Sequence, residues 1–181
     1  MNDTMRAYVQ WADIGDAERT HDFQAYVKNI AEARHVTRRV LRIVDDQAKR
    51  NGLEPLLHQA LLQVYGSASG EGITVSRLAD RLDVAAAFAS RLVRRLEDMA
   101  LVRRQPSAGD RRSTNVIATD AGIEKLAAID ADVHYHVAYL QHQLTEAQRL
   151  SALSIYAFYV GLDPDSSIAK AIRDRATAGQ D

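Results

Sequence analysis

The chain of 181 residues contains no cysteine, only three prolines and nine glycines, and few aromatic side chains, which make up 6% of the sequence. Without cysteine there is no disulfide, no thiolate nucleophile, no thiolate metal ligand and no thiol redox switch. The low glycine and proline content excludes collagen-like and low-complexity chains, and 46% hydrophobic residues suffice for a packed core. The composition is that of an ordinary globular protein, and the length of 181 residues indicates one domain or two small ones.

Long hydrophobic runs are also missing. The richest stretch, Leu150–Leu162, is interrupted by serines and by Gly161, and it falls short of the roughly 20 apolar residues that cross a bilayer. The segment Met1–Thr20 carries four acidic side chains and no apolar centre, unlike a secretory or transit signal. We therefore expect a cytoplasmic protein with no membrane role.

Hydrophobic residues at three- and four-residue spacing predict a mainly α-helical chain. The first long helix is expected over Asp22–Lys49, and a second helix should run from Pro55, which suits the first helical turn, to Gly66. After Thr119, which suits a helix cap, another long helix should continue to about Leu144 and be followed by a further one.

Between these helices the pattern tightens into two short helices and a hairpin. Thr74 can cap a helix that ends at Leu82, and a tight turn should lead into a further helix. The segments Leu101–Gln105 and Thr114–Ala118 favour β-strands on either side of a polar, basic tip. This order predicts a helix-turn-helix with a two-stranded β-wing.

The long helices at both ends bury too little surface alone, which favours pairing with a second copy of the chain. Residues 1–53 are expected to form an N-terminal arm and dimerisation helix, and residues 54–118 a winged helix-turn-helix lobe. Residues 119–181 should supply the C-terminal dimerisation helices.

The formal net charge of −1 hides an uneven distribution of charge. The stretch Thr74–Ala118 carries nine arginines, no lysine and five acidic side chains, so it is +4 while the rest of the chain is −5. Arginine favours bidentate contacts to phosphate or guanine over diffuse attraction. We interpret the stretch as a nucleic-acid-binding module in an acidic frame.

Part of the chain resembles the winged helix-turn-helix of the MarR (multiple antibiotic resistance regulator) family of transcriptional regulators. The similar segments are Thr74–Leu82, Ser90–Glu97, Leu101–Arg104, Asp110–Arg112 and Thr119–Gly122. The resemblance implies a homodimer on a pseudo-palindromic operator in double-stranded DNA. The recognition helices would enter successive major grooves, and the wings would reach phosphates or the minor groove.

The resemblance assigns DNA contacts to the two short helices and the wing. Ser90 and Arg91 stand where the family has a hydroxyl residue and an arginine, and Asp110 and Arg112 match its Asp-x-Arg wing motif around the variable Arg111. The expected DNA-binding residues are Ser76, Arg77, Ala86, Ala87, Ser90, Arg91, Arg94, Arg95, Asp110, Arg111 and Arg112.

At the start of the recognition helix the chain departs from the family pattern. The family commonly has serine, arginine or threonine there, whereas this chain has three alanines and a phenylalanine over Ala85–Phe88. These side chains cannot hydrogen-bond to base edges and can only press against thymine methyl groups. Specificity is therefore expected from Ser90, Arg91 and Arg94, from methyl contacts, and from minor-groove shape read by the wing. Packing in the core is the alternative role for Phe88.

The first long helix carries Arg34, Arg38 and Arg42 four residues apart, together with His35 and Arg39. Like charges at this spacing repel, so an acidic partner surface or an anionic ligand would compensate them. The resemblance implies a repressor that leaves DNA when a small aromatic acid or its coenzyme A thioester binds. The expected effector residues are Trp11, Tyr26, Arg34, His35, Arg38, His58 and Tyr65. A solvated basic stripe beside ordinary core aromatics is the alternative.

Three other functions are alternatives to this one. A metal-responsive regulator would use His134, His136 and His142, but His134 and His142 are about two turns apart, so ligands such as His21 would have to complete a site. An architectural DNA-binding protein would show no ligand response. An enzyme is not expected, because the sequence has no Gly-rich phosphate loop, Gly-x-Ser-x-Gly elbow or His-Glu-x-x-His motif. We expect no cofactor and no metal site.

Overall fold

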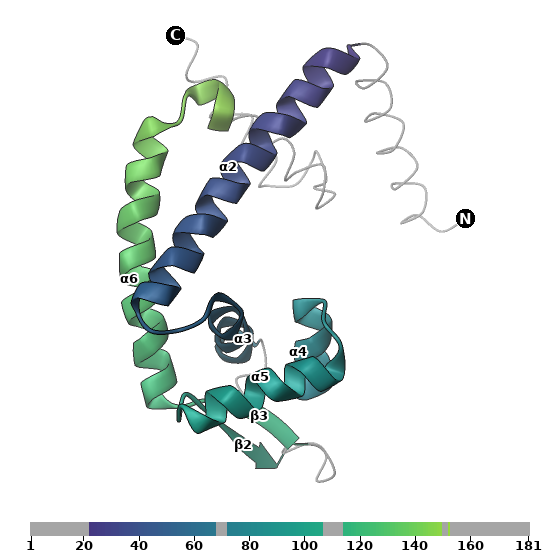
Figure 1. The fold of residues 1–181 in the computed structure, drawn as a ribbon, viewed down its shortest axis with the longest axis vertical. Helices are drawn as coiled ribbons and strands as arrows, with labels where there is room; N and C mark the ends of the chain where they lie inside the picture. Colours follow the sequence, from purple (N-terminus) through teal and green to yellow (C-terminus); the bar gives the residue numbers. More distant parts are fainter. Residues whose placement is uncertain (1–21, 68–71, 107–113, 150–151, 153–181) are drawn as a thin grey trace, which may run out of the picture. The chain divides into compact units, whose positions relative to one another are not determined.

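The computed structural model describes residues 22–67, 72–106, 114–149 and 152 (Figure 1). The helices are α2 (Phe23–Arg50), α3 (Pro55–Tyr65), α4 (Val75–Leu82), α5 (Ala86–Asp98) and α6 (Asp120–Gln143), and the strands are β1 (Ile73–Thr74), β2 (Val102–Pro106) and β3 (Thr114–Ala118). The predicted fold class is confirmed, with two short helices and a β-wing between long helices. No helix in the described part of the chain is long and apolar enough to span a membrane.

The chain forms two compact units, and the helices α2 and α6 each contribute to both. The first unit comprises Met1–Val40 and Leu140–Asp181, and the second comprises Leu41–Tyr139. The second unit thus contains the two short helices and the sheet. The three-part division expected from the sequence stays a prediction.

Hydroxyl side chains start two of the helices as the sequence predicts. The Oγ1 atom of Thr74 accepts a hydrogen bond from the Arg77 backbone N–H at 3.3 Å, and that of Thr119 accepts one from the Gly122 N–H at 3.1 Å. Such caps satisfy backbone donors that have no partner within the helix. Helix α4 ends at Asp83, whose φ of 53° is left-handed and turns the chain toward α5.

The sheet is antiparallel and has the strand order β1-β3-β2. Strands β2 and β3 pair from Val102 opposite Ala118 to Pro106 opposite Thr114, which is the predicted wing. Strand β1 was not predicted, because two residues carry no periodicity and its partner Val116 lies far along the chain. Thr74 therefore serves both as a strand residue and as the cap of α4.

The core of the second unit lies where α3, α4 and α5 pack together and against β3. Its most deeply buried large side chains are Leu53, Leu57, Leu61, Val64, Leu78, Val93, Leu96, Val116 and Ile129. Each such leucine or valine stabilises the fold by about 1.5–3 kcal/mol relative to an exposed position. Helices α4 and α5 therefore each bury one face in this core, and their opposite faces are exposed.

Candidate nucleic-acid interface

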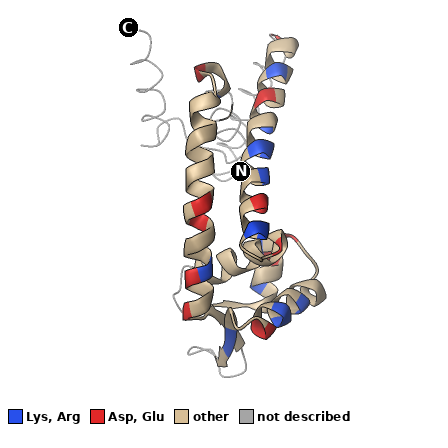
Figure 2. Ribbon diagram, turned by 60° about the vertical axis from the view of Figure 1, so that its left-hand side comes forward, with Lys and Arg blue, Asp and Glu red and all other residues tan. Residues whose placement is uncertain are grey.

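Helix α5 has one buried and one exposed face. Its buried side chains are Ala89, Leu92, Val93 and Leu96. Because an α-helix turns once every 3.6 residues, the side opposite them presents Ala87, Arg91 and Arg94, and all three are exposed. In Figure 2 the ribbon is blue at the positions of the basic residues on this helix and on β2. The geometry leaves small and cationic groups on most of the outward surface of α5, and the acidic Asp98 lies on the same side at the last residue of the helix.

Arg95, on the flank of α5, forms an ion pair with Glu54 of the same chain. Its two terminal nitrogens donate to both carboxylate oxygens of Glu54, one of them at 2.9 Å, so the ion pair is bidentate. This hydrogen bonding lowers the pKa of the Glu54 carboxyl and raises the pKa of the Arg95 guanidinium. Glu54 immediately precedes Pro55, so the pair joins α5 to the start of α3.

Two further arginines are also engaged within the lobe. The Nε atom of Arg104 donates to both carboxylate oxygens of Glu97 at 3.1 Å, which ties β2 to the last turn of α5. The Nε atom of Arg81 donates to the amide oxygen of Gln63 and links α4 to α3. These contacts brace the elements of the lobe against one another.

The remaining arginines of α4 and α5 differ from these. Within the described residues, the side chains of Arg77 and Arg94 form no hydrogen bond or ion pair, and both are exposed. Arg91 is exposed as well, and its guanidinium carbon lies 5.2 Å from the centroid of the Phe88 ring. Arg77, Arg91 and Arg94 are thus exposed arginines of these two helices whose guanidinium groups pair with no acid or amide among the described residues.

The predicted DNA-binding residues of α4 and α5 all lie at the surface of the second unit. Those exposed in the structure are Ser76, Arg77, Ala86, Ala87, Ser90, Arg91, Arg94 and Arg95. The predicted wing residues Asp110, Arg111 and Arg112 lie outside the described residues. The sequence reasoning missed Glu54 and Glu97, because pairs between distant elements leave no signal in one sequence.

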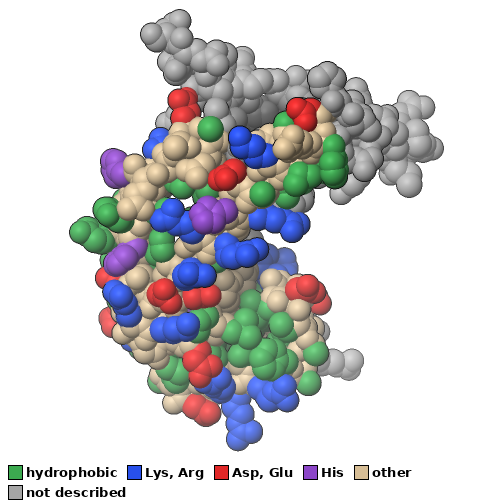
Figure 3. All heavy atoms as spheres, turned by 45° about the horizontal axis from the view of Figure 1, so that its top comes forward, with side chains coloured by type: hydrophobic (Ala, Val, Ile, Leu, Met, Phe, Trp, Pro, Cys, Tyr) green, Lys and Arg blue, Asp and Glu red, His purple; other side chains and the backbone are tan. Residues whose placement is uncertain are grey.

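The predicted effector residues on α2 belong to the first unit. Arg34, His35 and Arg38 are exposed and Tyr26 is half-buried, and Figure 3 shows basic side chains gathered over this helix. Neighbouring Arg39 donates a hydrogen bond to the amide oxygen of Gln143 at 3.0 Å. The predicted effector residue Trp11 lies outside the described residues.

The other two predicted effector residues lie on α3, in the second unit. His58 is only 5% exposed, and its Nδ1 atom has no hydrogen-bond partner among the described residues. Burial lowers the pKa of His58 and outweighs the opposing fields of Asp45 and Asp130, so the ring is uncharged at neutral pH. Tyr65 is exposed at the end of the helix, two turns from His58.

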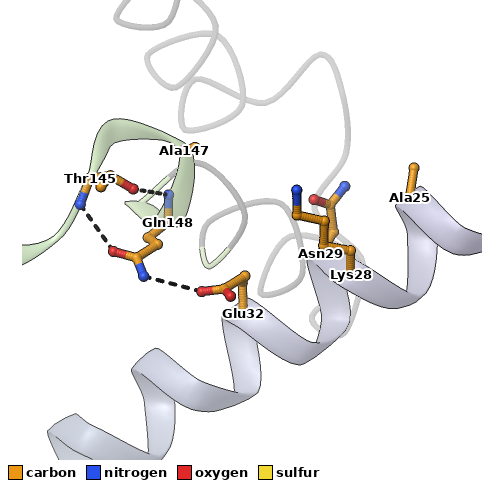
Figure 4. Close-up of a pocket in the computed structure, with 7 residues that line it drawn as sticks. All are labelled: Ala25, Lys28, Asn29, Glu32, Thr145, Ala147 and Gln148. Atoms are coloured by element: carbon orange, nitrogen blue, oxygen red, sulfur yellow. Dashed lines mark hydrogen bonds between the residues drawn. The ribbon is translucent and has the colours of Figure 1, made fainter.

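A cavity of about 440 Å³ lies in the first unit (Figure 4). The described residues that line it are Ala25, Lys28, Asn29, Glu32, Thr145, Ala147 and Gln148. Thr145 and Gln148 cap each other's backbone N–H groups at 3.0 and 3.3 Å, and the Gln148 amide donates to Glu32 at 3.2 Å. Among the described residues, no predicted effector residue lines the cavity. The Thr-x-x-Gln spacing behind the reciprocal capping is a helix-start signal that the sequence does contain.

The metal-sensing alternative depends on the histidines of α6. His136 makes a hydrogen bond through Nδ1 with the Asp132 carbonyl at 2.9 Å and packs edge-on against Tyr135. Among the described residues, no group of three or more His, Asp or Glu side chains is placed to hold a metal ion. His21 lies outside those residues, and the alternative has no support from the part of the chain that the structure describes.

Comparison with known proteins confirms the family resemblance, since residues 51–113 match the MarR family. No curated protein matches the chain. Among solved structures, the MepR–DNA complex of S. aureus is 21% identical, with a TM-score of 0.57 and coverage of 71% of this chain and 93% of that one. YusO from Bacillus subtilis is 22% identical, with a TM-score of 0.55 and coverage of 78% and 99%. At these identities the likeness is one of fold.

Proposed function

We propose that this chain, whose residues 51–113 match the MarR family, is a sequence-specific DNA-binding transcriptional regulator. One observation carries the proposal: on α5, the second helix of the helix-turn-helix, the outward face presents small side chains, Arg91 and Arg94, and its acidic residue Asp98 stands at the far end of the helix. A helix of this kind fits the major groove, where arginine recognises guanine through O6 and N7.

Helices α5 and α4 would make different contacts with DNA, α5 with the bases and α4 with the phosphates. The exposed Ala86 and Ala87 at the start of α5 let its backbone approach the bases closely and press on thymine methyl groups. Ser76 and Arg77, at the start of α4, are suited to phosphate oxygens, which fix the position of the lobe without reading sequence. The wing residues Asp110, Arg111 and Arg112 would extend the contact to phosphates or the minor groove.

The active form would be a homodimer that acts as a repressor. The long helices leave large apolar side chains exposed, namely Phe23, Val27, Leu41, Tyr135 and Tyr139. A second copy of the chain would cover such residues on the helices of residues 1–53 and 119–181. The dimer would place two copies of α5 on a pseudo-palindromic operator.

The salt dependence of binding tests this function most directly. Arg77 and Arg94 of two protomers, together with Arg111 and Arg112 of the two wings, would neutralise about six to eight phosphates and give a log-log slope of affinity against salt of roughly −5 to −7. The measurement is fluorescence anisotropy over a series of KCl concentrations, on the duplex that the protein enriches from a random-sequence library. A slope near zero, or no enrichment, would refute the proposal.

An anionic aromatic effector would release this regulator from DNA. The exposed Arg34, His35 and Arg38 on α2 offer cationic groups for a carboxylate or a thioester of coenzyme A. In a thermal-shift screen of aromatic acids and acyl-coenzyme A thioesters, at least one compound should raise the melting temperature of the wild type. The same compound should leave an Arg34→Ala/Arg38→Ala variant unchanged. If no compound stabilises the wild type, an effector-independent architectural DNA-binding protein is the better description.

A further inference from the structure

Phe88 connects the core of the lobe to the outward face of α5. It is half-buried and packs against the core cluster. Arg91 follows three residues later, so the two side chains lie on neighbouring positions of the helix surface. The guanidinium carbon of Arg91 lies over the Phe88 ring, 5.2 Å from its centroid. One aromatic side chain therefore contacts both the fixed interior and an exposed cation.

This contact restricts an otherwise flexible side chain. A planar guanidinium is attracted to the face of an aromatic ring, and the stacking limits the rotamers that the arginine can adopt. Bidentate hydrogen bonding to guanine demands an oriented guanidinium fork, whereas a phosphate accepts an arginine in many orientations. An arginine that is oriented before binding is thus better suited to a base than to the backbone of DNA.

We propose that Phe88 is a positioning residue that holds Arg91 for a base-reading contact, an inference that rests on the proposed function. Arg94 lies one turn from Ser90 on the same exposed side of α5, but the structure describes no ring or acid against its side chain. Arg91 then supplies sequence preference, and Arg94 supplies affinity that is independent of sequence. Phe88, which follows the three alanines of Ala85–Phe88, would then orient Arg91 in addition to packing against the core.

A double-mutant cycle on the full chain tests the proposal. The variants are Phe88→Leu, Arg91→Ala and the two combined, with Phe88→Tyr as the control that keeps the ring. The probes are the duplex enriched by the wild type and poly(dI-dC) as sequence-independent DNA. Phe88→Leu should weaken binding to the enriched duplex about five-fold and leave binding to poly(dI-dC) unchanged, because loss of stacking removes pre-orientation rather than charge. Phe88→Tyr should bind as the wild type does.

The decisive comparison is made in the Arg91→Ala background. There, Phe88→Leu should change the affinity less than about two-fold, because the residue through which Phe88 acts is gone. Equal losses in both backgrounds, or no loss in either, would overturn the proposal. Phe88→Met, which keeps apolar volume without a ring, replaces Phe88→Leu if circular dichroism shows that the leucine variant is unfolded. A wild type that binds neither probe would overturn the proposed function as well, whereas an additive cycle overturns the positioning role alone.

Discussion

Replacing Arg91 and Arg94 together by alanine should weaken binding to the enriched duplex roughly 100-fold or more. A good arginine contact to a base, as proposed for Arg91, is worth about 1–3 kcal/mol, and the loss of Arg94 also removes a cation that attracts the phosphates. Both side chains lie on the outward face of α5, and a dimer would lose each of them twice. The measurement is an anisotropy titration at one fixed salt concentration. Circular dichroism should show an unchanged melting transition, because neither side chain is buried.

The matched control removes the same number of charges from the same lobe. Arg95→Ala/Arg104→Ala deletes two arginines that already pair with Glu54 and Glu97. The expected loss of affinity is less than about ten-fold, because these side chains contribute mainly long-range attraction to DNA. Equal losses in the two double variants would show that total charge, rather than the outward face of α5, governs binding.

Replacing Gly122 by alanine should destabilise the fold by about 2–3 kcal/mol, although alanine is ordinarily the better helix former. A Cβ atom at this position would lie 2.1 Å from the carbonyl oxygen of Leu101. That oxygen also accepts a hydrogen bond from the Thr119 N–H at 3.0 Å, so the backbone around it is held in place. The melting temperature should fall by about 4–10 °C. Thermal and urea unfolding, followed by circular dichroism, measure both quantities.

Gly66→Ala is the control for the glycine substitution. Gly66 has a φ of −77°, which alanine adopts without strain, and a Cβ there would lie 3.0 Å from the Leu62 carbonyl oxygen. Its expected effect is within about 0.5 kcal/mol. If Gly122→Ala also unfolded at the wild-type temperature, the close packing of the first turn of α6 on Leu101 would be wrong.

Most of the fold could be predicted because its signals are local. Hydrophobic spacing, a proline at the first turn and hydroxyl caps predict the helices, and α3 begins at Pro55 as expected. Strand β1 could not be predicted, since its two residues form a strand only through pairing with β3. A close approach such as that of Gly122 to Leu101 likewise depends on tertiary packing.

The candidate site was predictable in its location and less so in its detail. In the sequence the arginines of Thr74–Ala118 look alike, yet the structure pairs Arg95 with an acid 41 residues away. Only the three-dimensional partners separate a bracing arginine from one that faces outward. The contact between Phe88 and Arg91 is local, unlike the pairing of Arg95 with a distant acid. Its three-residue spacing on one helix can be read from the sequence.

The alanines at the start of α5 also bear on the entropy of recognition. Ala86 and Ala87 have no side-chain rotamers to lose, so ordering them against a partner carries no side-chain entropy cost. Arg91 is already restricted by the Phe88 ring. Among the described arginines of the outward faces of α4 and α5, the cost of immobilisation therefore falls mainly on Arg77 and Arg94. The start of α5 therefore has little side-chain freedom to lose when a partner binds, because its side chains are small.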